Sequence, residues 1–159
     1  MLHAAEKMPA SVVGLVGIAA DPDFTEDVVL PKLSEEIKKK IQAEGAADFE
    51  WGGKQYTLTQ KMIEDGRDMC LLSKGPGTIP VDVPVRLIQG LGDEEIPPER
   101  ALKLSDSIQG KDVVITYVKY GSHEMDDTEA DFKRIYVQIE DIDRTLGKKK
   151  WQVSMQRPV

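Results

Sequence analysis

Two apolar runs near the middle of the chain each end in a turn that carries an ionisable residue, and this pattern limits the possible folds most. Asp93 follows the first run, with Glu94 and Glu95 beside it, and His123 follows the second. Each run is short and continuously apolar, which is typical of a strand buried on both faces. Helical periods follow both runs. This order predicts an α/β fold in which helices connect parallel strands.

Outside one central region, the sequence predicts three strands and two helices. The strands are expected over residues 11–20, 83–91 and 113–120, and the helices over 97–110 and 126–142. A further short helix is expected at the amino terminus, before Pro9. In the helix over 97–110, the buried positions are expected to be Ala101, Leu102, Leu104 and Ile108. In the helix over 126–142, the residues that share one face are Phe132, Ile135, Ile139 and Ile142. Residues 143–159 show no such period and are expected to form a tail.

A region of roughly 60 residues separates the first two strands, which is too long for a plain loop. We treat residues 22–82 as an insertion with its own structure. Residues 49–56 alternate around Gly52 and Gly53 and predict a hairpin. One helix face is expected to carry Leu30, Leu33, Ile37 and Ile41. A second helix is expected to open with a capping box over residues 57–60 and to bury Leu58, Met62, Ile63, Met69 and Cys70.

Asp93 and His123 are the candidate catalytic residues. Polar side chains at the carboxyl ends of parallel strands gather at one rim of the sheet, so these two are expected to converge. A histidine can move protons near neutral pH, and a carboxylate can orient it. Asp93 is chosen over its acidic neighbours because it lies nearest the strand end. The alternatives are a surface histidine and an ordinary acidic turn.

Composition and other motifs narrow the function further. The net charge of −7 argues against a nucleic-acid partner. No apolar run approaches the ~20 residues of a membrane span, and no targeting segment is visible. Cys70 is expected to be a core thiol and His3 to lie on a helix surface. The acidic residues 21–27 lack the turn glycine of a calcium loop, so we expect no metal and no cofactor.

Three segments carry a resemblance to a known family: MLHAA…GLVGIAADPDFTE, YTLTQKMIEDGRDMCLL and VRLIQGLGDEEIPPERA…KYGSHEM. Over residues 1–142 the chain resembles the branch of the α/β-hydrolase superfamily that contains the mitochondrial palmitoyl-protein thioesterase, also described as an acyl-glucuronide esterase. The resemblance implies the carboxyl-terminal portion of an α/β-hydrolase fold, with three parallel strands in an incomplete sheet. It makes the insertion a lid, Asp93 the acid and His123 the base.

The function implied by this resemblance is a serine hydrolase of acyl esters or thioesters, with an S-palmitoylated protein as one candidate substrate. The family's nucleophilic serine precedes the segment matched by residues 1–5, and no Gly-x-Ser-x-Gly occurs here. The chain alone is therefore expected to be inactive. The resemblance implies a mitochondrial location; without it, the expectation is the cytoplasm.

Two other readings stay open. The chain could be a catalytically dead fragment or interaction module that self-associates through an exposed sheet edge. A flavodoxin-like binding domain is a third reading, although it would not predict the order of Asp93 and His123.

Overall fold

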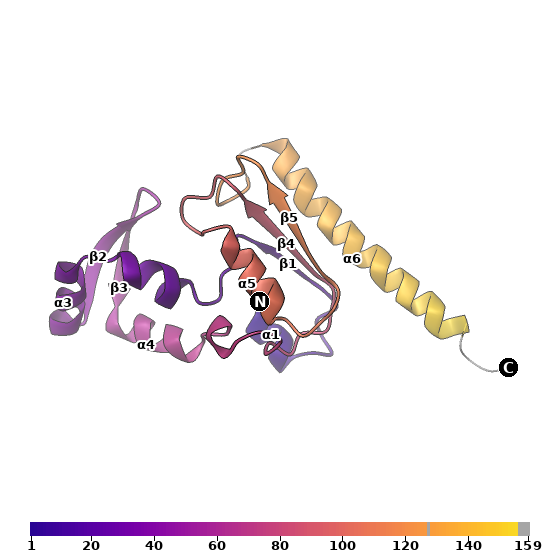
Figure 1. Cartoon of the computed structure of the whole chain (residues 1–159), viewed down its shortest axis with the longest axis horizontal. Helices are drawn as coiled ribbons and strands as arrows, with labels where there is room; N and C mark the ends of the chain where they lie inside the picture. The colour runs from indigo at the N-terminus through magenta and orange to yellow at the C-terminus, as the bar shows by residue number, and fades with distance from the viewer. Residues whose placement is uncertain (127, 156–159) are drawn as a thin grey trace.

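The chain folds around a parallel sheet of three strands, as predicted (Figure 1). The computed structural model describes residues 1–126 and 128–155. Strands β1 (Leu15–Ile18), β4 (Val85–Gly90) and β5 (Val113–Val118) lie in the order β1-β4-β5. Both neighbouring pairs are parallel. The predicted α/β class and the three parallel strands are thus confirmed.

Helices cover both faces of this sheet. α1 (Leu2–Lys7) and α5 (Glu99–Ser107) pack on one face, and α6 (Glu129–Met155) lies along the other (Figure 1). α5 begins directly after Pro98, because proline is well suited to the start of a helix and poorly suited to its interior.

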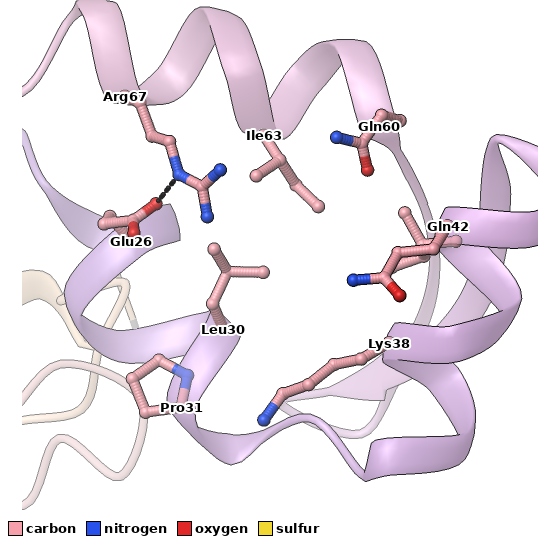
Figure 2. A pocket seen from close by; sticks show the side chains of 9 residues that line it. Glu26, Leu30, Pro31, Lys38, Gln42, Gln60, Ile63 and Arg67 are labelled. Carbon is pink, nitrogen blue, oxygen red and sulfur yellow. Dashed lines mark hydrogen bonds and ion pairs between the residues drawn. The ribbon is translucent and has the colours of Figure 1, made fainter.

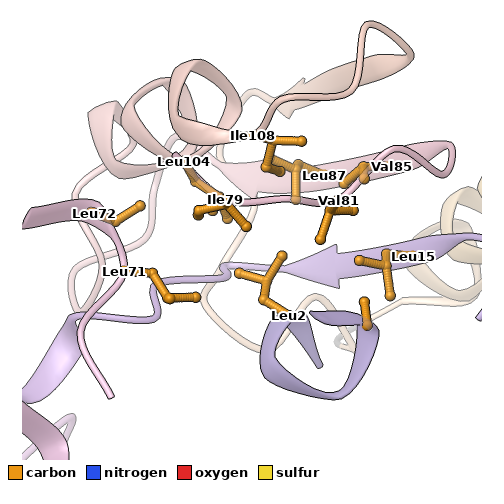
Figure 3. Packing of buried hydrophobic residues seen from close by; sticks show 11 residues of the cluster. Leu2, Leu15, Leu71, Leu72, Ile79, Val81, Val85, Leu87, Leu104 and Ile108 are labelled. Atoms are coloured by element: carbon orange, nitrogen blue, oxygen red, sulfur yellow. The ribbon is translucent and has the colours of Figure 1, made fainter. Parts of the chain in front are cut away.

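The main hydrophobic core lies between the sheet and the two shorter helices (Figure 3). Ile79 and Leu104 are fully buried there, at 0% exposure. The strands, helices and connecting segments contribute Leu2, Ala5, Leu15, Leu71, Leu72, Ile79, Val81, Val85, Leu87, Leu104 and Ile108. Burial of one such large side chain stabilises a fold by about 1.5–3 kcal/mol. This cluster therefore joins α1, the end of the insertion and α5 to one sheet face.

On the opposite face, a buried arginine attaches α6 to the central strand. Arg86 is 3% exposed and donates from Nε to Asp141 of α6 at 2.7 Å and from Nη1 to Asp112 at 2.8 Å. Burial disfavours the charged guanidinium, but these carboxylates outweigh burial and raise the pKa of Arg86 above its ordinary value. The arginine interrupts an apolar strand without leaving a buried charge unpaired.

The insertion forms a unit of its own beside the sheet, on the side away from α6 (Figure 1). In chain order it consists of a π-helical turn (Thr25–Val29), α2 (Leu30–Lys32), α3 (Glu35–Glu44), β2 (Ala46–Trp51), β3 (Lys54–Thr59), α4 (Gln60–Asp68) and a 3-10 turn (Leu72–Lys74). The hairpin predicted around Gly52 and Gly53 is confirmed. A second apolar cluster fills the unit and contains Val29, Leu33, Ile41, Ala47, Leu58 and Ile63.

A buried aspartate joins the two ends of the insertion. The Asp23 carboxylate, 1% exposed as a residue, accepts hydrogen bonds from the backbone N–H groups of Leu71, Leu72 and Ser73 at 2.6–3.1 Å. Backbone donors of this kind satisfy a buried carboxylate without a counter-ion. These hydrogen bonds therefore hold the start of the insertion against its end.

Arg100 of α5 adds a second attachment near the same point. Its guanidinium donates to both oxygens of Asp21 at 2.6 and 2.8 Å and to Asp27 at 2.8 Å, and Lys103 also reaches Asp27. Paired hydrogen bonds of this type are among the stronger ion pairs in proteins. The acidic segment that superficially resembles a calcium loop thus binds arginine, lysine and backbone amides.

Several predicted boundaries were wrong. β1 covers four residues of the ten predicted, and Val13 is exposed before it. The helix expected to end at residue 142 continues to Met155, because residues 143–155 contain good helix formers and no proline, so a helix can persist without an apolar face. The proposed domain boundary at 142 stays a prediction, and residues 156–159 lie outside the described residues.

Within the insertion, two capping residues differ from the prediction. Ser34 interrupts the helix expected over Leu30 to Ile41, since its hydroxyl accepts from the Ile37 N–H and starts α3 afresh. Thr59 caps α4, because Thr57 belongs to β3 and donates its hydroxyl to Asp48.

Some predicted core positions are exposed. They are Met62, Met69, Leu102, Phe132 and Ile139. Each lies on or beside a helix that contacts only one neighbouring layer. The apolar residues of such a helix span a wider arc than the face that this contact buries, so those at the margin are exposed. Ile63, Ala101, Leu104, Ile108 and Ile142 are buried as expected.

The attachment at Arg100 predicts a pH dependence of stability. Burial alone would raise the pKa of Asp27, but Arg100 and Lys103 outweigh it and hold this pKa below its ordinary value of 3.8. The stabilisation is therefore present above about pH 4 and is lost as pH falls through the lower folded value. Asp27→Asn should reduce the free energy of unfolding at pH 7 by about 0.5 kcal/mol, since a third of the side chain is exposed.

Urea unfolding at pH 7 and near pH 2 measures this difference. The gap between Asp27→Asn and the parent should close at the lower pH. Asp143→Asn, an exposed change on α6, is the control and should show no such gap. A gap that is constant with pH would contradict the role of the Asp27 charge.

Candidate functional site

The turns after β4 and β5 bring Asp93 and His123 together. Asp93 Oδ2 lies 3.1 Å from His123 Nδ1, although 30 residues separate them. Both turns follow the carboxyl ends of adjacent parallel strands, which is the convergence expected from the sequence. The Asp93 side chain is fully buried, whereas that of His123 is 33% exposed. The carboxylate is thus enclosed and the imidazole is accessible.

Asp93 is held in place by four donors. Its Oδ1 accepts from the backbone N–H groups of Glu95 and Ile96, each at 2.9 Å. Its Oδ2 accepts from Gln89 Nε2 at 3.0 Å in addition to His123. These four hydrogen bonds satisfy both oxygens of the buried carboxyl group. Glu94 and Glu95 make no contact of this kind with the histidine.

Glycine permits the close approach of the two turns. A Cβ added to Gly90 would lie 2.2 Å from the carbonyl oxygen of Gly121, so no larger residue fits at either turn without displacing backbone. Gly92 N–H donates to that same carbonyl at 3.1 Å. Beneath the turn, Met125 is fully buried and has a positive φ of 52°, which is unusual for a residue other than glycine. The packing of these backbones therefore sets the distance between Asp93 and His123.

The contact with Asp93 determines which imidazole nitrogen can act as a base. A carboxylate accepts hydrogen bonds, so the neutral ring carries its proton on Nδ1 and donates it to Asp93. Nε2 then has the lone pair and can take a proton from a hydroxyl or thiol. This arrangement matches the acid and base of a nucleophile–base–acid triad.

An apolar cavity of about 280 Å³ opens beside His123 and is roofed by the insertion. Its lining is formed by Phe24, Thr25, Val29, Phe49, Trp51, Tyr56, Thr57, Leu58, Met62, Glu95 and His123. Trp51 is fixed by an edge contact with Phe24, with ring centres 5.5 Å apart, and by Lys32, whose ammonium lies 4.7 Å from the indole centre. A mostly apolar cavity with one titratable group at its edge suits an apolar ligand with a reactive polar end.

A second cavity, of about 370 Å³, also borders His123 and is polar. Gly52, Lys54, Gly92, Glu94, Glu95, Ser122, His123 and Glu124 line it. Lys54 Nζ donates to Glu124 at 2.9 Å, which connects the β2–β3 turn to the turn that carries His123. Only His123 and Glu95 belong to both linings.

A third cavity, of about 360 Å³, lies inside the insertion between α2, α3 and α4 (Figure 2). Its wall includes the ion pair of Arg67 with Glu26 at 2.8 Å. None of its lining residues belongs to either cavity at His123, so it is separate from the candidate site.

The remaining titratable candidates have structural contacts. His3 was expected to be a surface residue, but its Nε2 lies 2.8 Å from the Met69 carbonyl oxygen and joins α1 to the end of α4. Cys70 is half-buried where full burial was expected. Burial, and then the charge of Asp23, raise the pKa of the Cys70 thiol, which disfavours the reactive thiolate. Neither residue lines a cavity at His123.

Sequence reasoning missed Gln89 and Glu95. Gln89 is 1% exposed inside an apolar strand. A polar side chain in such a strand needs buried hydrogen-bond partners, so its presence in the apolar run was the available sequence signal. Glu95 was treated only as a competitor of Asp93. No residue pattern indicates that Glu95 separates two cavities, since that depends on where the hairpin packs.

The chain is similar to known proteins over most of its length. The chain is 34% identical over 151 residues to the rat protein "Palmitoyl-protein thioesterase ABHD10, mitochondrial", covering 89% of the chain and 47% of that protein. It is 29% identical over 145 residues to the human protein of that name, covering 89% and 46%. The chain thus spans about half the length of the curated relatives it matches. No family model matches.

Two solved structures show the same arrangement of elements. Mouse α/β hydrolase domain-containing protein 10 superposes with a TM-score of 0.72 at 33% identity, covering 93% of this chain and 57% of that one. A protein from Agrobacterium vitis S4 gives a TM-score of 0.79 at 29% identity, covering 89% and 56%. The family resemblance predicted from the sequence is confirmed.

The contacts of Asp93 predict a large effect on stability. Asp93→Ala should lower the free energy of unfolding by about 2–4 kcal/mol, because it leaves the backbone N–H groups of Glu95 and Ile96 without their acceptor and removes one of the acceptors of the Gln89 amide. Glu94→Ala, at the exposed neighbouring position, should change it by no more than about 0.5 kcal/mol. Urea denaturation of both variants tests the difference, and similar losses would show that the carboxylate does not organise this turn.

Proposed function

We propose that this chain, which has the fold of the carboxyl-terminal part of an α/β hydrolase, supplies the base and the acid for hydrolysis of acyl esters or thioesters. The observation that carries the proposal is the Asp93–His123 pair at the edge of an apolar cavity. The relatives named as palmitoyl-protein thioesterases support it. A protein acylated on cysteine is the substrate that those names suggest.

In the proposed mechanism, His123 Nε2 removes a proton from a serine hydroxyl while that oxygen attacks the acyl carbonyl. The imidazolium then gives the same proton to the departing alcohol or thiol. Asp93 keeps the ring in the correct tautomer and stabilises its positive charge without becoming protonated. In the second half of the reaction, His123 takes a proton from water while the water oxygen attacks the acyl-serine carbonyl. The imidazolium then returns that proton to the serine oxygen as the serine–acyl bond breaks and the acid leaves.

The acyl chain is assigned to the apolar cavity under the insertion, which acts as a lid. Phe24, Phe49 and Trp51 provide aromatic surface there. The serine and the oxyanion donors are assigned to protein outside these 159 residues, because no Gly-x-Ser-x-Gly occurs among them. We also propose a mitochondrial location, on the names of the relatives. No helix in the described part of the chain is long and apolar enough to cross a bilayer.

Activity of a protein that combines this chain with a nucleophilic serine tests this mechanism. His123→Ala should lower kcat on an octanoyl thioester by about 10³–10⁴-fold, because the general base and acid are lost together. His3→Gln alters the only other histidine and should retain most of the turnover. The chain of 159 residues should not react with a fluorophosphonate probe. Full activity of His123→Ala would refute the assignment.

A second candidate function is an interaction module, and the edge of the sheet favours it. β1 pairs with β4 on one side, and among the described residues no strand pairs with its other side. Unpaired backbone groups at such an edge can bind a further strand.

Sedimentation of the isolated chain tests this second candidate. Association through β1 should appear as concentration-dependent dimers. Val16→Pro removes a backbone donor from the middle of β1 and should abolish the dimers. Tyr117→Pro on β5, at the opposite end of the sheet, is the matched control, because the even-numbered residues of β5 pair with β4 and the Tyr117 N–H points away from it. A monomer at all concentrations would count against this function.

A further inference from the structure

The cavity between α2, α3 and α4, here called the insertion cavity, has no part in the proposed hydrolysis, yet its lining is that of a ligand site. Its volume of about 360 Å³ lies within the range of about 300–1,000 Å³ that is typical of small-molecule sites. Leu30, Ile41 and Ile63 supply apolar surface. Polar side chains of α3 and α4 project into the space around them (Figure 2).

Arg67 is the main group of this cavity that can bind an anion. Its Nε donates to Glu26 Oε2 at 2.8 Å, and its guanidinium projects into the space between Leu30 and Ile63 (Figure 2). Among the described residues, neither terminal nitrogen of this guanidinium donates a hydrogen bond. These two nitrogens can donate a parallel pair of hydrogen bonds, which is a geometry in which arginine binds a carboxylate. The ion pair with Glu26 thus orients the guanidinium and leaves its outer edge available.

The charges around the cavity favour a ligand with a single negative charge. Lys38 lies at its edge and donates to Glu35 at 2.9 Å, so both cations of the lining, Lys38 and Arg67, are already paired with carboxylates. Binding therefore depends on the free N–H groups of Arg67, and on the Gln42 amide that points into the space from α3 (Figure 2), more than on an excess of positive charge. A dianion gains less here, because Glu26 repels its second charge.

The insertion cavity shares two walls with the apolar cavity beside His123. Thr25 and Val29 line the apolar cavity, whereas Glu26 and Leu30, each one position further along the same helical segment, line the insertion cavity. Residues four apart lie on one helix face, so this segment presents adjoining faces to the two spaces. α4 contributes side chains to both linings as well. A ligand in the insertion cavity would therefore fix two elements that also shape the apolar cavity.

We propose that the insertion cavity is a second binding site, which takes a monocarboxylate with a compact apolar body. The carboxylate accepts two hydrogen bonds from the terminal nitrogens of Arg67, and the apolar body lies against Leu30, Ile41 and Ile63. No serine, cysteine or histidine belongs to the described lining, so the ligand is bound there and not converted. The proposal does not rest on the hydrolase function, because none of the lining residues takes part in it.

Titration of the chain with benzoate, followed by NMR of its isoleucine methyl groups, tests the proposal without turnover. Benzoate should shift the methyl signals of Ile41 and Ile63 with a dissociation constant on the order of 1 mM. Benzamide has the same ring without the charge and should bind at least about fivefold more weakly. The indole signal of Trp51 reports the apolar cavity in the same samples. Shifts confined to Trp51, or tighter binding of inorganic phosphate than of benzoate, would overturn the proposal and leave the hydrolase function untouched.

Variants of Arg67 test its role as the anchor. Arg67→Gln should weaken benzoate binding by roughly tenfold, because the charge and the paired donors are lost together. Arg67→Lys keeps the charge without the paired geometry and should still weaken binding by at least about threefold. Lys61→Gln, an exposed change on the same helix that lines neither cavity, removes one positive charge as Arg67→Gln does and should leave the affinity unchanged. Full affinity in both Arg67 variants, or an equal loss in Lys61→Gln, would refute the assignment.

Discussion

The buried carboxylate of Asp93 is the interaction on which the rest of the site depends. It has no cation beside it and is stabilised by four hydrogen-bond donors, of which two come from its own turn and one from Gln89. Because the bonds from Gln89 and from the Ile96 N–H are buried, rotation of the carboxylate would remove an acceptor from buried donors. The orientation of His123 follows from this arrangement. Gly90 and Gly121 make it possible, since their backbones are too close for side chains.

The insertion is fixed firmly at its base and weakly at its tip. At the base, Asp23 binds three backbone amides of the returning chain, and Arg100 binds Asp21 and Asp27. At the tip, the Lys54–Glu124 pair is more than half exposed on both sides, so it adds little to stability. This difference allows the hairpin to move relative to His123 without unfolding of the base.

The sheet and the contact between Asp93 and His123 could be predicted from sequence because both depend on local signals. Apolar runs mark the parallel strands, and the geometry of such sheets brings the turns that carry Asp93 and His123 to one rim. Helix boundaries and buried faces were less predictable. Thr59 rather than Thr57 caps α4 because β3 claims Thr57, and Leu102 is exposed because α5 covers a single face. The contact of Arg100 with Asp21 spans 79 residues and has no local signal.

Glu95 connects the turn that carries Asp93 with the hairpin of the insertion. Its N–H helps to hold Asp93, while its carboxylate packs against Gly52 at the tip of the insertion. A change in the hairpin position therefore alters the shape of both cavities through the same residue that supports the acid. In this arrangement the position of the hairpin and the support of Asp93 are not independent properties. Replacement of Gly52 by a residue with a side chain would displace Glu95 first, because no space separates them, before it disturbed the bond between Asp93 and His123.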